Sequence, residues 1–365
     1  VHFAVDGYAL ANYDGTSLYE YPHAAVGQSE WGSCNFMHSR GEVRSFLQSA
    51  ADFWISEYHM DGLRMDAVSR AIYWQGDPAR GVNSNAAEFL KNMNRGLKER
   101  HPSVILAAED STCFPGVTAD PEKGGLGFDY KWDMGWMNDT LDYFRTDPLY
   151  RGWDYNKLTF SMAYYSDERY LLPLSHDEVV HGKAAILQKM FGDYELKFPQ
   201  ARAFYMYMYA HPGKKLNFMG NEIGHFREWD EKREQDWELL EYPAHREFHC
   251  FMKALNRFYL EHPAFWENDY DEDGFQWLEC GTPDQCIYAF ERRAHKERIA
   301  AVFNFSGISQ TGLCLKIPGG KKLEEIFSSG ASISGEIKRK ESLSSAAGAF
   351  ELEMAPFSAD YYLIR

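Results

Sequence analysis

The chain has 365 residues, 45% of them hydrophobic and 25% charged, which is typical of a soluble globular protein with room for two domains. Its formal net charge of −16 argues against nucleic acid and anionic membrane surfaces as partners, because both are negatively charged. No apolar run approaches the ~20 residues that span a bilayer. The first residues lack the parts of a signal peptide, and a start at Val rather than Met suggests that upstream residues are missing.

Six cysteines are scattered along the chain without the spacing of a metal site. We therefore expect free thiols in a reducing compartment, which predicts a cytoplasmic protein. A disulfide between Cys280 and Cys286 across a hairpin is the less favoured alternative.

Helical spacing of apolar residues predicts helices at residues 41–57, 85–100, 134–144, 199–210 and 248–260. The apolar face of the first helix is expected to contain Val43, Phe46, Leu47, Ala50, Phe53 and Trp54. The apolar side of the second is expected to contain Phe89, Leu90, Met93 and Leu97.

Short apolar runs lie between these helices, and several of them end in polar residues. One run ends at Asp66, and another, apolar at every position from Val104 to Ala108, ends at Glu109. Continuous apolarity favours a parallel strand buried on both faces. A third run, "YLLPL", leads to His176 and Asp177, "KKLNFMGNE" is a fourth, and "GFDYKWD" is a weaker candidate. Alternating helices and strands with polar residues at the strand ends are typical of a (β/α)8 barrel.

The pattern changes near residue 265. Six short alternating runs follow: "FQWLE", "CIYAFERR", "RIAAVFNFS", "LCLKI", "FELEM" and "DYYLIR". Turn signals such as "PGG" and "SSG" separate them, which predicts an antiparallel β-sandwich. The expected organisation is a barrel domain at residues 1–264 and an all-β domain at residues 265–365.

Three strand ends carry acids: Asp66, Glu109 and Asp177. Each acid taken alone is equally well explained by a structural ion pair or a helix N-cap. Two carboxylates that face each other across a sugar are, however, the minimum for glycoside chemistry. Arg64 would keep Asp66 ionised as a nucleophile requires, and desolvation after the apolar run would raise the pKa of Glu109 toward that of a general acid. His176 and Asp177 would contact sugar hydroxyls.

The segments "GLRMDAV", "AAEDST" and "LSHDEVVHGK" resemble three of the four signature segments of the α-amylase superfamily. Their surroundings resemble the 1,4-α-glucan branching enzymes in particular, most specifically in "GGLGFDYKWDMGWMNDTLDYF" and "LNFMGNEIGHFREWD". The resemblance is close up to about residue 260 and looser beyond it. It implies an enzyme that cleaves an α-1,4 glucan and transfers the segment to a 6-hydroxyl, with α-glucan as donor and acceptor.

The resemblance also implies a role for each matching residue. Asp66 matches the nucleophile, Glu109 the general acid/base and Asp177 the third carboxylate. Substrate-binding roles are implied for three further residues, His2, Arg64 and His176. No metal or organic cofactor is expected, because carboxylates supply both the nucleophile and the proton.

The start of the chain departs from the family. His2 is expected at the end of the third barrel strand, so the first two strands and the preceding carbohydrate-binding module would be absent. The chain is therefore expected to be the C-terminal part of such an enzyme, a barrel lacking its first strands, and to be inactive by itself. Met65 replaces the usual valine, which is a mild change.

Two other functions remain open from the residues. The first is an α-amylase-type or debranching hydrolase, since the acids alone do not separate transfer from hydrolysis. The second is a non-catalytic glucan-binding protein, in which aromatic residues stack on sugars. The tryptophans that would serve this role, although core packing explains each of them as well, are Trp31, Trp132, Trp136 and Trp229.

Overall fold

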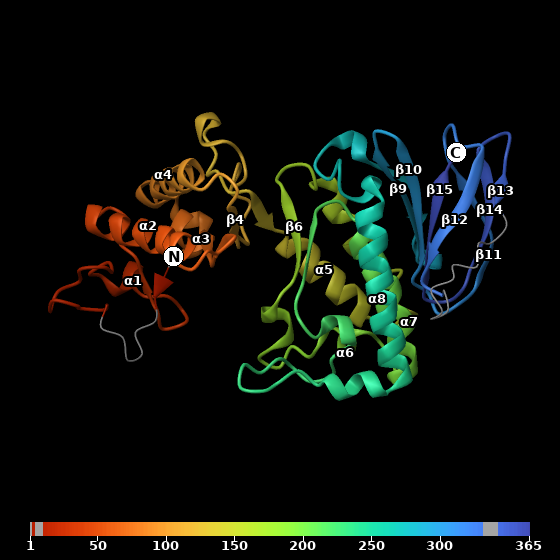
Figure 1. The fold of residues 1–365 in the computed structure, drawn as a ribbon, viewed down its shortest axis with the longest axis horizontal. Coiled ribbons are helices and arrows are strands. Elements are labelled where there is room, and N and C mark those ends of the chain that lie inside the picture. Colours follow the sequence, from red (N-terminus) through yellow and green to blue (C-terminus); the bar gives the residue numbers. More distant parts are fainter. Residues whose placement is uncertain (1, 4–9, 331–341) are drawn as a thin grey trace. The chain divides into compact units, whose positions relative to one another are not determined.

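The computed structural model describes residues 2–3, 10–330 and 342–365. It contains two compact units, one of Val1–Met134 with Asp167–Tyr170 and one of Gly135–Ser166 with Leu171–Arg365. Figure 1 labels the helices and strands of the units. Within the described ranges, no helix is both long enough and apolar enough to cross a bilayer.

Three parallel strands lie at the centre of the first unit: β3 (Gly62–Met65), β4 (Ile105–Ala108) and β5 (Tyr130–Trp132). The helices before and between them are α2 (Gly41–Ser56), α3 (Val68–Ile72) and α4 (Ser84–Arg100). The four residues predicted for the apolar side of α4 are all buried in the core between helices and sheet. The alternating pattern is therefore confirmed in this unit.

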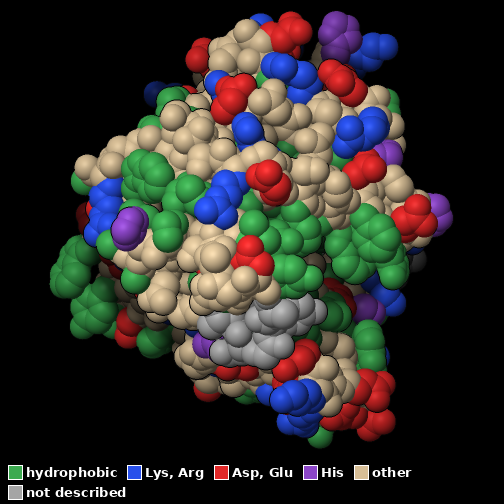
Figure 2. All heavy atoms as spheres, turned by 90° about the vertical axis from the view of Figure 1, so that its left-hand side faces the viewer, with side chains coloured by type: hydrophobic (Ala, Val, Ile, Leu, Met, Phe, Trp, Pro, Cys, Tyr) green, Lys and Arg blue, Asp and Glu red, His purple; other side chains and the backbone are tan. Residues whose placement is uncertain are grey.

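Two predicted apolar surfaces of this unit are less buried than expected. On α2, Val43 is buried and Leu47 packs against the core as a face of apolar residues would suggest, but Phe46, Phe53 and Trp54 are exposed. The core is instead contacted by Ile55, which lies outside the predicted face. Ile105 of β4 is 49% exposed, so that strand is not buried on both faces over its full length. Hydrophobic side chains also reach the surface on the face shown in Figure 2.

Three short elements complete the N-terminal part: β1 (His2–Phe3), α1 (Ala24–Gly27) and β2 (Cys34–Asn35). β1 pairs antiparallel with β2, with His2 opposite Asn35. Among the described residues, His2 is therefore held by this antiparallel pairing and not by a parallel pairing with β3.

The second unit continues the alternation. Its elements are α5 (Met134–Arg145), β6 (Tyr170–Leu174), α6 (Ile186–Lys189), α7 (Tyr194–Ala210), β7 (Lys214–Asn217) and α8 (Pro243–Glu261). β6 and β7 are parallel, with Leu174 opposite Asn217. α7 begins earlier than predicted because the side chain of Asp193 accepts a hydrogen bond from Leu196 N at 3.2 Å and caps the helix.

The same unit contains the all-β region, in which a six-stranded and a two-stranded antiparallel sheet share one core. The six strands, in sheet order, are β13 (Leu343–Ser344), β12 (Lys322–Ser328), β15 (Ser358–Ile364), β10 (Glu297–Asn304), β9 (Ile287–Ala294) and β8 (Phe275–Thr282). The other sheet contains β11 (Gln310–Lys316) and β14 (Ala349–Met354). This arrangement confirms the predicted β-sandwich, whereas the boundary at residue 264 stays a prediction.

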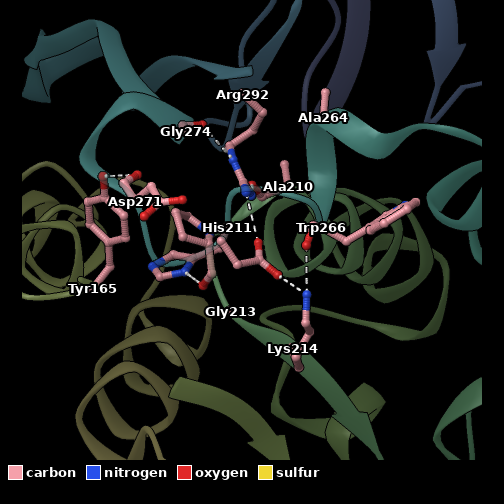
Figure 3. A network of polar contacts seen from close by, with 12 residues as sticks. Tyr165, Ala210, His211, Gly213, Lys214, Ala264, Trp266, Asp271, Gly274 and Arg292 are labelled. Carbon is pink, nitrogen blue, oxygen red and sulfur yellow. Dashed lines mark hydrogen bonds and ion pairs between the residues drawn. The ribbon is translucent and has the colours of Figure 1, made fainter. Parts of the chain in front are cut away.

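A buried ion pair joins the β-sandwich to the start of β7 (Figure 3). The carboxylate of Asp269 lies 2.8 Å from Arg292 Nη2 and 2.7 Å from Lys214 Nζ. Arg292 also donates to the carbonyls of Ala210, at 2.7 Å, and Gly274, at 3.2 Å. Since the side chains of Asp269 and Arg292 are fully buried, each depends on the other for charge compensation.

Candidate active site

The pairing of β3 with β4 places Asp66 and Glu109 next to each other. Met65 is paired with Ala108, and the ladder continues beyond the strands because Glu109 N donates to Met65 O at 3.0 Å. Val68 N then donates to Glu109 O at 2.8 Å. Both acids therefore follow directly on a common rung of the sheet, at the carboxyl ends of parallel strands.

One guanidinium contacts both carboxylates. Arg64 Nη2 lies 2.9 Å from Asp66 Oδ1 and 3.6 Å from Glu109 Oε2. The two oxygens can therefore be no farther apart than the sum of these distances. The guanidinium also lies over the ring of the buried Trp132, 4.2 Å from its centroid, which fixes its plane.

A histidine hydrogen bond reaches Asp66 from a distant part of the chain. His2 Nε2 lies 3.1 Å from Asp66 Oδ2, and His2 Nδ1 lies 2.7 Å from the hydroxyl of Ser33. Because an ionised carboxylate can only accept, Nε2 carries a proton, and in the neutral imidazole Nδ1 accepts from Ser33. Ser33 is in turn 2.6 Å from the hydroxyl of Ser29.

These contacts stabilise the ionised form of Asp66. The hydrogen bond from His2, followed by the positive charge of Arg64, lowers the pKa of Asp66 below its usual value, although partial burial opposes the change. Asp66 is thus a carboxylate at neutral pH, while half of its side chain remains open to solvent. This is the protonation state that a nucleophile requires.

Glu109 is more enclosed, with 17% of its side chain exposed. Its Oε2 accepts a hydrogen bond from the backbone N–H of Ala67 at 2.6 Å. The expected desolvation is therefore present, but the carboxyl is not remote from cations, since Arg64 lies beside it. Ala67 itself has a φ of 46°, an unusual left-handed conformation for a residue with a Cβ.

The second unit holds the other two predicted site residues. His176 and Asp177 lie in a 3₁₀ helix, His176–Val179, directly after β6. His176 Nε2 is 3.4 Å from Asp177 Oδ1, and Asp177 N donates to the hydroxyl of Ser175 at 3.2 Å. The rings of Phe218 and Trp229 flank His176 at 5.9 and 6.1 Å. That Asp177 acts together with Asp66 and Glu109 stays a prediction.

The four tryptophans differ in burial and in surroundings. Trp132 and Trp136 are buried and pack in the core. Trp31 is 59% exposed, and its ring lies 5.3 Å from that of His2, the histidine that contacts Asp66. Trp229 packs against His176. Trp31 is accordingly the tryptophan best placed for stacking on a sugar near Asp66.

The structure brings His2, Arg64, Asp66 and Glu109 into one cluster and His176 into contact with Asp177. Reasoning from the sequence missed Ser33 and Ala67, which fix His2 and Glu109. No signal in the sequence identifies Ser33, because its partner is distant along the chain. The only local signal for Ala67 is its position directly after Asp66.

Known proteins resemble this chain over most of its length. Residues 277–364 match a family model described as the α-amylase C-terminal all-β domain. The chain is 45% identical over 340 residues to the 1,4-alpha-glucan branching enzyme GlgB 1 of Clostridium perfringens (strain SM101 / Type A), covering 89% of this chain and 50% of that protein. It is 48% identical over 310 residues to GlgB of Fusobacterium nucleatum, covering 84% of this chain and 50% of that protein.

The chain belongs to the 1,4-α-glucan branching enzyme family of the α-amylase superfamily. It spans about half the length of the curated relatives that it matches. The fold of the chain is also that of the crystal structure of AmyP in complex with maltose, with a TM-score of 0.65 at 16% identity over 94% of this chain and 73% of that one. The predicted fold class, a (β/α)8 barrel lacking its first strands followed by a β-sandwich, is confirmed.

Proposed function

We propose that this chain carries the catalytic carboxylates of a 1,4-α-glucan branching enzyme. The observation that carries the proposal is the contact of one guanidinium, that of Arg64, with the carboxylates of both Asp66 and Glu109. Two close carboxylates suit a retaining double displacement. The relatives named as branching enzymes, at 45% and 48% identity, support the choice of acceptor.

In the proposed mechanism, Glu109 protonates the oxygen of the α-1,4 bond while Asp66 attacks the anomeric carbon, and a covalent glycosyl intermediate forms. Glu109 then accepts the proton of a glucan 6-hydroxyl, which displaces Asp66 and creates an α-1,6 branch. Arg64 and His2 keep Asp66 ionised for the first step. Asp177 and His176 bind the hydroxyls of the distorted sugar.

We also propose the substrates and the cellular location of the protein. The donor and the acceptor are α-glucans, and neither nucleic acid nor a membrane surface is a partner of so acidic a chain. We place the protein in the cytoplasm, because all six cysteines, each within the described residues, are free. The carboxylate chemistry requires no metal or organic cofactor.

The test is an assay of amylose branching by the 365-residue chain, alone and joined to the part of the C. perfringens relative that it does not match. We expect the joined protein to lower iodine staining and to form α-1,6 linkages with little new reducing sugar. Abundant reducing sugar would favour a hydrolase. Binding of glucan without turnover by the joined protein would favour a binding protein.

The same assay tests the nucleophile through Asp66→Asn. This substitution removes the attacking charge but keeps the shape, so we expect turnover to fall by about 10⁴-fold or more. Asp61→Asn, at an exposed aspartate just before β3, is the matched control and should be fully active. Substantial branching by the Asp66 variant would contradict the assignment.

A further inference from the structure

The segment that follows Asp177 has an unusual backbone. After the 3₁₀ helix His176–Val179 it turns back to reach α6 at Ile186. Within this turn His181, Gly182 and Ala184 have φ values of 58°, 81° and 67°. Two of these residues carry a Cβ, and such left-handed conformations persist only where surrounding contacts hold them. We call residues 178–184 the β6–α6 loop.

The ammonium of Lys189 occupies the inside of the β6–α6 loop. Lys189 is the last residue of α6, and 4% of it is exposed. Its Nζ donates to the carbonyls of Lys183, at 2.8 Å, Glu178, at 2.5 Å, and Ala184. A lysine ammonium has three N–H donors, and all three are used on backbone of this loop.

Glu228 and Trp229 also form hydrogen bonds with the loop. The carboxylate of Glu228 accepts hydrogen bonds from Gly182 N at 3.0 Å and Ala184 N at 2.8 Å. The next residue, Trp229, donates its backbone N–H to Val179 O at 2.8 Å. The ring of Trp229 contacts His176, so the loop and the imidazole share one support.

The site of Lys189 is costly for a cation. Burial, together with the charge of Arg145, lowers the pKa of Lys189 to about 8, whereas Glu178 and Glu228 act in the opposite direction. The charged groups that face Lys189 also include Lys183, which opposes its charge as Arg145 does. The side chain is still mostly protonated at neutral pH. Burying a cation costs free energy on folding, so a buried lysine is expected to have a specific structural or functional role. Strongly shifted pKa values are also frequent at functional sites.

We propose that Lys189 is a positioning residue, whose ammonium holds the β6–α6 loop in the conformation that presents His176 and Asp177. Charge-assisted hydrogen bonds to three carbonyls of one loop are stronger than neutral ones and converge on a single point. The role of Lys189 in turnover rests on the proposed function of Asp177. Its role in holding the loop does not, and the two are tested separately.

The first experiment is hydrogen–deuterium exchange of the 365-residue chain. In Lys189→Met, which keeps the length of the side chain, we expect exchange of the amides at 178–184 to accelerate about tenfold or more, as for the loss of a charged hydrogen bond. Exchange in α7 should not change. Lys189→Arg keeps the charge and should restore part of the protection.

The matched control is Lys183→Met in the same loop. Within the part of the chain that the structure describes, the ammonium of Lys183 makes one contact, 3.5 Å from Glu178 Oε1, and nearly half of the side chain is exposed. We expect wild-type exchange in this variant. Unchanged exchange at 178–184 in Lys189→Met, or an equal increase in Lys183→Met, would overturn the proposal.

The second experiment measures branching by the joined protein described above. Lys189→Met should lower kcat about tenfold or more with a smaller change in KM, because misplacing Asp177 weakens transition-state contacts more than ground-state binding. If the wild-type protein branches no glucan, the proposed function fails while the exchange result still stands. If loop exchange rises and kcat is unchanged, the positioning role is wrong.

Discussion

At the scale of single residues, the pKa of Asp66 depends on a histidine 64 positions earlier in the chain. A sequence motif indicates Arg64 as the partner of Asp66, because the two are nearly adjacent. The structure shows that the hydrogen bond from His2 lowers the pKa of Asp66 more than the charge of Arg64 does. The family resemblance implies that His2 is a substrate-binding residue. No local sequence pattern predicts that His2 lowers the pKa of the proposed nucleophile.

The first prediction concerns the variant His2→Ala. Because the hydrogen bond from His2 lowers the pKa of Asp66, its loss should raise that pKa. Branching needs the ionised form, so the acid limb of the profile of kcat/KM against pH should move to higher pH. His23→Ala is the control, since His23 is exposed and its side chain does not cap α1. An acid limb that shifts downward, or stays in place, would contradict this account.

At the scale of elements, strand and helix positions were largely predictable, because they depend on local apolar periodicity. β12 (Lys322–Ser328) was missed for a physical reason: Glu325 occupies an inward position of the strand and is buried, so the alternation is hidden. α2 shows the converse, because only part of its apolar face packs on the core, while Phe46, Phe53 and Trp54 of that face are exposed. Periodicity gives the element, but the packing partners decide which residues become buried.

The turn from β3 to α3 gives the second prediction. Ala67 has a left-handed backbone, whereas Ala71 lies inside α3. Glycine adopts the first conformation freely but weakens a helix. Ala67→Gly should leave the free energy of unfolding unchanged or raise it by up to about 1 kcal/mol, while Ala71→Gly should lower it by about 1 kcal/mol.

Urea denaturation of the two glycine variants checks this difference. The backbone N–H that Glu109 accepts is retained in Ala67→Gly, so that variant should also keep its branching activity in the joined protein. Equal destabilisation of both variants would show that the backbone at Ala67 is not strained.

At the scale of the whole molecule, contacts between segments far apart in the sequence hold the β-sandwich in its unit. Asp269, Arg292 and Lys214 lie in segments well separated along the chain, and periodicity carries no information about such pairings. In the sequence, Arg292 lies at the charged end of a predicted strand, and nothing there indicates that its side chain is buried. Its full burial depends on tertiary contacts such as the hydrogen bond to the carbonyl of Ala210 at the end of α7.

The third prediction is that Arg292→Met lowers the free energy of unfolding of this part of the chain by about 3–5 kcal/mol, because the substitution leaves Asp269 buried without its main partner. Glu324→Gln removes one partner of the 3.5 Å pair with Arg365 at the protein surface, where Arg365 is exposed and Glu324 partly so, and should cost about 0–1 kcal/mol. Thermal unfolding followed by circular dichroism compares the two. A similar small loss in both variants would show that the buried pair contributes little.

The pairing of β3 with β4 has a stereochemical consequence. Neighbouring strands of a sheet are separated by about 4.7–4.9 Å, and Asp66 and Glu109 follow the same rung, Met65 with Ala108. Retention requires carboxyl groups about 5–5.5 Å apart, and inversion about 6.5–9.5 Å. In the proposed enzyme, the pairing of β3 with β4 therefore favours retention, because it starts both acidic side chains from neighbouring strands at the same level of the sheet.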